Sequence, residues 1–178
     1  LFGEDLSEAY DHPLFVAHGV AGVVSMALVV AILAGLVLRI GDRAPGAFAP
    51  VASGLTLLGT VAVAGGIWAE GFLVPFIGGK DPSVLVGDPG GVLLTALIAG
   101  GALFSTGWLS MAIVLRQADL ASRATATVLG VSAVVAFLPF PGTTLVFLVA
   151  LAVVTARVCA SPAAASAPLS ASAVPVNA

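Results

Sequence analysis

The chain has 178 residues, of which 60% are hydrophobic and 8% are charged, and its net charge is −3. A typical soluble domain is about 25% charged and about 45–50% apolar, so this chain has too few charged side chains to cover a soluble surface. The basic residues form no cluster, which leaves no electrostatic footprint for a nucleic acid. We therefore exclude a soluble enzyme, a disulfide scaffold and a nucleic-acid-binding protein, and expect an integral protein of a lipid bilayer.

The N-terminal residues 1–13 are acidic and contain no Lys or Arg. A signal peptide begins with a positively charged region, so we interpret this stretch as an extracytoplasmic segment instead. The first apolar run, Leu14 to Leu38, follows directly and ends at Arg39. A membrane-spanning helix needs roughly 20 apolar residues, and this run is long enough.

Two further runs have the length of a membrane span. Val51 to Phe76 contains one charged residue, Glu70, and a late proline, Pro75. The polar stretch 78–91, rich in Gly, Pro and Asp, is typical of a loop. Val92 to Leu115 follows, with Trp108 in its second half, where we expect it to pack in the core.

The last apolar region, Ala124 to Ala156, is too long for one comfortable span of roughly 20 residues. Two prolines, Pro139 and Pro141, interrupt it and disfavour a continuous helix. We predict a helical hairpin with arms at 122–138 and 143–158, each at the lower limit for spanning. The alternative is one long kinked helix, which would make four helices instead of five.

The positive-inside rule favours the hairpin. With the N-terminus outside and five helices, one side of the membrane receives five basic residues: Arg39, Arg43, Arg116, Arg123 and Arg157. Only Lys80 then lies outside, whereas four helices would also place Arg157 there. We predict an all-α, polytopic transmembrane bundle of five helices over 14–158, with its N-terminus outside. The Ala/Ser/Pro-rich residues 159–178 are expected to be a disordered tail.

Small residues recur at i, i+4 spacing along every predicted helix and indicate where helices approach closely. The pairs and stripes are Ala27, Ala31 and Gly35; Ala62 and Gly66; Ala96 and Gly100; Gly101 and Ser105; and Ala126 and Gly130. Most of them are expected to pack within the chain. The alternative for any of them is an interface with another membrane subunit or a second copy.

Two ionisable residues fall inside the predicted spans, and such residues need a partner or a role because inserting them costs about 2.5–3.5 kcal/mol. His18 lies roughly 7–8 Å and Glu70 roughly 9 Å from the outer ends of their helices, at 1.5 Å per residue. We hypothesise that they pair and line an outer pocket that binds a ligand or a proton. Alternatively, the pair only fixes helix register, or Glu70 is hydrated at the interface.

Other side chains at comparable depth would complete this pocket. Thr95, Thr143 and Thr144 would add hydroxyl groups, and Trp68 and Phe72 would form apolar walls. Gly71 and Pro75 would loosen the helix near Glu70 and free backbone carbonyls.

No cofactor or catalytic centre follows from the sequence. The only histidines, His12 and His18, lie about 120° apart on a helical wheel and cannot clamp one haem. The lone cysteine, Cys159, forms neither an internal disulfide nor a zinc site, and no catalytic motif is present. The nature of any cofactor stays open, and we predict no metal site.

One sequence pattern gives a resemblance. The segment from Trp68 to Phe76, a later Asp-Pro loop, and Gly107-Trp108 before Arg116 together resemble a pattern of small, uncharacterised multi-pass membrane proteins of high-GC bacteria. The resemblance implies a bacterial plasma membrane and brings no activity with it. We therefore expect a non-enzymatic accessory subunit, or a binder of a small or lipidic ligand. The alternative is a small transporter or proton-coupled carrier that uses Glu70 and His18.

Overall fold

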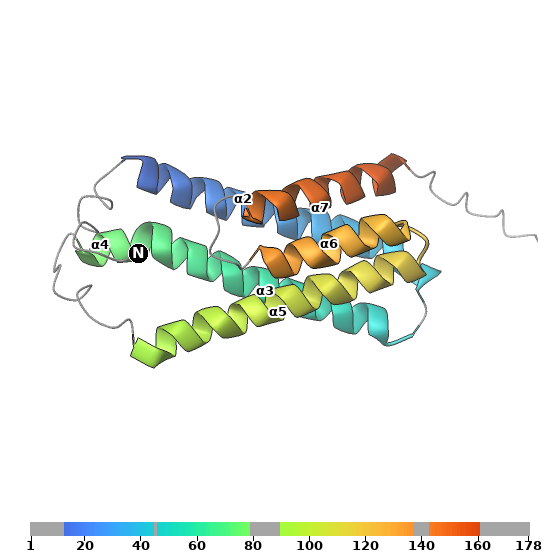
Figure 1. Ribbon diagram of the computed structural model, residues 1–178, viewed down its shortest axis with the longest axis horizontal. Coiled ribbons are helices and arrows are strands. Elements are labelled where there is room, and N and C mark those ends of the chain that lie inside the picture. The colour runs from blue at the N-terminus through green and yellow to red at the C-terminus, as the bar shows by residue number, and fades with distance from the viewer. Residues whose placement is uncertain (1–12, 45, 79–89, 137–142, 161–178) are drawn as a thin grey trace, which may run out of the picture.

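The computed structural model describes residues 13–44, 46–78, 90–136 and 143–160, and these residues form helices and turns without a strand. The helices are α2 (Pro13–Ile40), η1 (Gly41–Arg43), α3 (Phe48–Trp68), η2 (Ala69–Leu73), α4 (Val74–Gly78), α5 (Gly90–Gln117), α6 (Arg123–Val135) and α7 (Thr143–Ala160). Because α3, η2 and α4 form one continuous rod, the described part of the chain is a bundle of five helices (Figure 1). The acidic N-terminal segment, the loop after Gly78 and the C-terminal tail of the sequence prediction lie outside the described residues.

Three helices are long and apolar enough to cross a membrane: Val16–Ile40, Phe48–Ile77 and Thr95–Gln117. The helices that contain these spans, α2, the rod from α3 to α4, and α5, extend the corresponding predicted runs by one to three residues at each end. The all-helical fold and the three long spans were thus predictable from local composition.

The last two helices, α6 and α7, are separate and run in opposite directions (Figure 1), which confirms the hairpin over the single kinked helix. α6 has 13 residues and is shorter than its predicted arm, which ran to residue 138. At about 1.5 Å per residue it rises about 20 Å, well short of a hydrocarbon core of about 30 Å. The hairpin therefore reaches only part of the way along the bundle (Figure 1).

The arginines gather at one end of the bundle, which we call the arginine end. Arg39, Arg116 and Arg157 lie in the last turns of α2, α5 and α7, while Arg43 ends η1 and Arg123 begins α6. All of these helix termini lie together on the right of Figure 1. The opposite end, where α2 and α5 begin and α4 ends, is called the open end.

The tightest helix crossing joins α3 and α5 through glycine. A Cβ on Gly59 would lie 2.4 Å from the Cα of Phe104, and a Cβ on Gly107 would lie 2.5 Å from the Cα of Thr56. Next to this crossing, the indole Nε1 of Trp108 donates a 3.2 Å hydrogen bond to the Oγ1 of Thr60. The crossing therefore depends on the absence of side chains at two positions.

The packing of α2 differs from the expected stripe. Ala27, Ala31 and Gly35 are exposed, and a Cβ on Gly35 would meet nothing within 4 Å. α2 instead approaches its neighbour through Gly19, which contacts Gly71 of η2. The prediction that this stripe packs within the chain is wrong. Two glycines nearer the open end, Gly19 and Gly22, allow α2 a closer approach to Gly71 and Ile67. Two other predicted positions do face a small residue of a neighbouring helix: Gly100 faces Ala62, and Gly130 faces Ala112.

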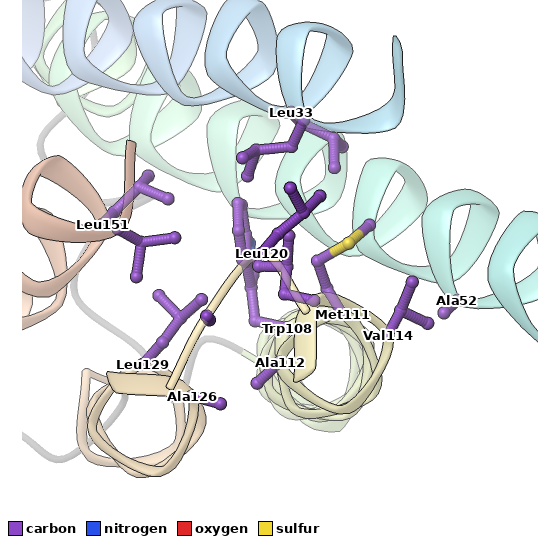
Figure 2. Packing of buried hydrophobic residues seen from close by; sticks show 14 of the residues in the cluster. Leu33, Ala52, Trp108, Met111, Ala112, Val114, Leu120, Ala126, Leu129 and Leu151 are labelled. Atoms are coloured by element: carbon purple, nitrogen blue, oxygen red, sulfur yellow. The ribbon is translucent and has the colours of Figure 1, made fainter. Parts of the chain in front are cut away.

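An aromatic cluster fills the middle of the bundle. Phe104 and Trp108 of α5 and Phe147 of α7 are at most 2% exposed, and their rings meet at centroid distances of 5.1 to 6.3 Å. Figure 2 shows Leu33 of α2, Leu129 of α6 and Leu151 of α7 converging on Trp108. The expectation that Trp108 packs in the core is confirmed.

The turn between α5 and α6 is closed by two local motifs. Leu120 N–H donates to the Leu115 carbonyl and Asp119 N–H to the Arg116 carbonyl, the pattern of a Schellman cap with Asp119 at a φ of 54°. The Ser122 hydroxyl then caps α6 by accepting from the Thr125 N–H at 3.2 Å. Together these hydrogen bonds satisfy backbone groups at the C-terminus of α5 and at the N-terminus of α6.

Candidate ligand cavity

Glu70 lies in a π-helical turn, η2, that interrupts the regular helix between α3 and α4. Pro75 explains the interruption, because proline has no N–H and its ring clashes with the carbonyl four residues earlier, here that of Gly71. The helix adapts by shifting to a wider bond, in which the Val74 N–H donates to the Ala69 carbonyl. Such π turns occur frequently at functional sites. The expected loosening of the helix at Gly71 and Pro75 is therefore present.

Gly19 of α2 and Gly71 of η2 bring the predicted pair to the same depth. A Cβ on Gly71 would lie 2.6 Å from the Cα of Gly19, so the two backbones touch. His18 and Glu70 are the residues directly before these glycines, and both are exposed. Among the described residues, no hydrogen bond or ion pair joins His18 to Glu70, so the two residues share a depth without either of these interactions.

A cavity of about 340 Å³ lies between α2, α3, η2, α5 and the α6–α7 hairpin. Its lining is mostly apolar and consists of Met26, Ala62, Val63, Gly66, Ile67, Glu70, Ala96, Leu97, Gly100, Gly101, Phe104, Ala136, Thr144 and Phe147. Phe104 and Phe147 belong to the aromatic cluster and form its floor, while Glu70 lies toward the open end. The cavity is partly open to the surroundings.

Two features of the fold leave this space. The α6–α7 hairpin is short, so that it reaches the cavity only through Ala136 and Thr144 near its tip and through Phe147 one turn further along α7. In addition, α3 and α5 diverge toward the open end (Figure 1), where small residues face each other across the gap. A Cβ on Gly66 would meet only the Cδ2 of Leu97, at 3.5 Å, in contrast to the backbone contacts at Gly59. Small residues thus allow close backbone contact between α3 and α5 at Gly59, whereas at Gly66, nearer the open end, they leave space between the two helices.

The predicted site residues are only partly brought together. Glu70 and Thr144 line the cavity, and Glu70 is the one ionisable residue in the described part of its lining. Thr95 is exposed and directly precedes the lining residue Ala96. Trp68 is 52% exposed and packs on Phe72 at a ring-centroid distance of 6.4 Å, away from the cavity lining. The side chain of Thr143 lies outside the described residues.

Sequence reasoning missed the aromatic floor, although a signal existed. Phe104 and Trp108 are four residues apart on one helix, and this spacing places them on the same face. Phe147 completes the floor only through tertiary packing, because it comes from the hairpin. Beyond the floor toward the arginine end, Met111 and Leu115 are fully buried. The cavity is therefore blind on that side.

The arrangement can hold an apolar molecule and present one carboxylate to it. Within the described part of the chain, no group of three His, Cys, Asp or Glu residues could hold a metal ion. Comparisons with protein families, curated proteins and solved structures find no match to this chain. The cavity is therefore the feature from which a function can be inferred.

Proposed function

We propose that this chain is an integral membrane protein that binds a small or lipidic ligand in the cavity without transforming it. The observation that carries the proposal is the cavity of about 340 Å³ between three helices of membrane-spanning length. Pockets for small molecules measure about 300–1,000 Å³, and they are predominantly apolar with few polar groups. A cavity at the low end of this range suits one acyl or prenyl chain or one small ring system.

The membrane in question is the plasma membrane of a bacterium, in accordance with the resemblance of the segment from Trp68 to Phe76. The N-terminus lies outside, because the five arginines then face the cytoplasm as the positive-inside rule requires. The open end is therefore external, and the cavity lies in the outer leaflet.

The protein would act as an accessory subunit of a larger membrane assembly or as a ligand carrier within the bilayer. The exposed stripe of Ala27, Ala31 and Gly35 supports the first role, since small residues favour close helix contact in lipid. A proton-coupled transporter is less well supported, because Phe104, Trp108 and Phe147 separate Glu70 from the arginine end. Such a transporter would need polar groups that continue through the bundle.

Ligand binding can be tested by filling the cavity. Gly66 lines the cavity and has room for a Cβ, so Gly66→Leu places a larger side chain inside it. The adjacent Gly65 is exposed, and a Cβ there would meet nothing within 4 Å, which makes Gly65→Leu a matched control on the same helix. After purification in a mild detergent, native mass spectrometry should show a retained non-protein molecule in the parent chain and in Gly65→Leu, and its loss in Gly66→Leu. Equal retention in both variants, or none in the parent chain, would contradict the proposal.

The orientation can be tested with the native thiol. Cys159 is the single cysteine and is exposed at the arginine end, at the end of α7. A membrane-impermeant maleimide should therefore leave Cys159 unlabelled in intact cells and label it after the membrane is opened. Labelling of intact cells would place the arginine end outside and reverse the topology.

A further inference from the structure

We propose that the ligand of the cavity is a single-chain amphiphile with a cationic headgroup, whose amine or ammonium pairs with Glu70 while its chain lies on the aromatic floor. This inference rests on the proposed function and adds the chemical class of the ligand. Two observations support it: the carboxylate of Glu70 lies near the open end of the cavity, and apolar aromatic side chains form the floor at the other end.

The two ends of the cavity differ in chemistry. Glu70 belongs to η2 near the open end, whereas Phe104 and Phe147 form the floor toward the middle of the bundle. Thr144, at the tip of the hairpin, adds one hydroxyl group, and the other lining residues are apolar. A molecule with one polar end and one apolar chain fits this polarity, because its head can reach Glu70 while its chain remains in contact with apolar side chains.

The sign of the headgroup charge follows from the residues around it. Among the lining residues that the structure describes, the only ionisable one is Glu70, whose carboxylate attracts a cation and repels an anion. The arginines that could hold an anionic headgroup lie at the opposite end of the bundle, in the last turns of α2, α5 and α7. An anionic lipid or a fatty acid therefore finds no positive partner among the described residues that line this cavity.

The position of Glu70 depends on the π turn and on the glycine contact beneath it. Gly71, the next residue, is buried against Gly19, and this contact fixes the backbone of η2 against α2. Glu70 is held beside a rigid contact while its side chain remains exposed. The carboxylate is thus accessible to a headgroup that arrives from the open end.

Trp108 provides a local probe for the test. It is fully buried and lies 5.3 Å from Phe147 by ring centroids, so a heavy atom at the cavity floor would quench it. The chain has two tryptophans, so Trp68→Phe leaves Trp108 as the only one. In nanodiscs of zwitterionic phospholipid, this variant is titrated with three dodecyl probes that carry bromine at the chain end: an amine, an alcohol and a carboxylate.

The amine should quench Trp108 with a half-saturation concentration up to about fivefold lower than that of the alcohol, because an exposed ion pair contributes at most about this factor. The carboxylate should be the weakest. Glu70→Gln should raise the amine value to that of the alcohol and leave the alcohol unchanged. Equal values for the three probes, or an unchanged amine value in Glu70→Gln, would overturn the ligand class.

The cavity variants separate this inference from the proposed function. If Gly66→Leu abolishes quenching by all three probes and Gly65→Leu does not, the cavity binds an apolar chain. That result supports the proposed function even if the half-saturation concentrations of the amine, alcohol and carboxylate do not differ as expected. If no probe quenches Trp108 more in the parent chain than in Gly66→Leu, ligand binding at the cavity itself is refuted.

Discussion

The glycine at the α3–α5 crossing offers a quantitative test of the fold. A Cβ at Gly59 would lie 2.4 Å from both the backbone N and the Cα of Phe104, whereas ordinary van der Waals contact begins at 3.4 Å. Since the obstacle is backbone, no side-chain rotation can relieve the clash. Gly59→Ala must therefore move α3 and α5 apart by about 1 Å at their crossing, a gap that forfeits a quarter to a half of each dispersion contact.

A glycine-to-alanine substitution elsewhere on α3 should raise the free energy of unfolding instead of lowering it. Gly54 is exposed and a Cβ there would meet nothing within 4 Å, so alanine gains only its better helix propensity of about 1 kcal/mol. Overpacking at Gly59 costs about 1–3 kcal/mol. Both substitutions gain the same helix propensity, so the two alanine variants should differ by the overpacking cost alone, about 1–3 kcal/mol in the free energy of unfolding, which is roughly fivefold to 150-fold in the folding equilibrium.

The assay follows the fluorescence of Trp108 while the protein in mild detergent is titrated with a denaturing detergent. The Trp68→Phe background removes the exposed second indole. The expected order of unfolding midpoints is Gly54→Ala at or above the parent chain and Gly59→Ala clearly below it. If Gly59→Ala unfolds at the same midpoint as Gly54→Ala, the helices do not cross through this glycine and the cavity geometry derived from that crossing fails as well.

Substitutions at three further sites test local interactions by titration with the same denaturing detergent. Asp119→Gly should stabilise the protein by about 1 kcal/mol, because glycine adopts the positive φ of 54° without strain; an unchanged or lower midpoint would contradict the cap at this position. Ser122→Ala should destabilise it by about 1 kcal/mol through loss of the α6 N-cap, and Ser122→Asp should restore most of that loss. Trp108→Phe, followed by circular dichroism, should cost about 2 kcal/mol from a lost hydrogen bond to Thr60 and a partly filled space. Trp68→Phe is its matched control and should change little, since that indole is half exposed.

The helices and their order follow from local properties of the chain. The runs around Leu14–Leu38, Val51–Phe76 and Val92–Leu115 became the three long helices, and α6 and α7 are separate helices on either side of the stretch that contains the two prolines. The five arginines lie at one end of the bundle because each of them stands at or beside a helix terminus and successive helices run in opposite directions. Length, apolar composition and helix-breaking residues are sufficient to predict these features. The matched depth of His18 and Glu70 was also predictable, since counting residues along antiparallel helices gives it.

Which faces meet, and where space remains, depends on the tertiary packing. Ala27, Ala31 and Gly35 form as regular a stripe as any in the chain, yet Gly19 and Gly22 make the contact. In lipid, a buried helix face is no more apolar than an exposed one, so hydrophobic periodicity does not mark it. The cavity depends on the divergence of α3 and α5 and on the short hairpin, two relations between helices that no single segment encodes. The sequence therefore identified Glu70 as the carboxylate of interest, whereas only the packing placed it at a cavity with an aromatic floor.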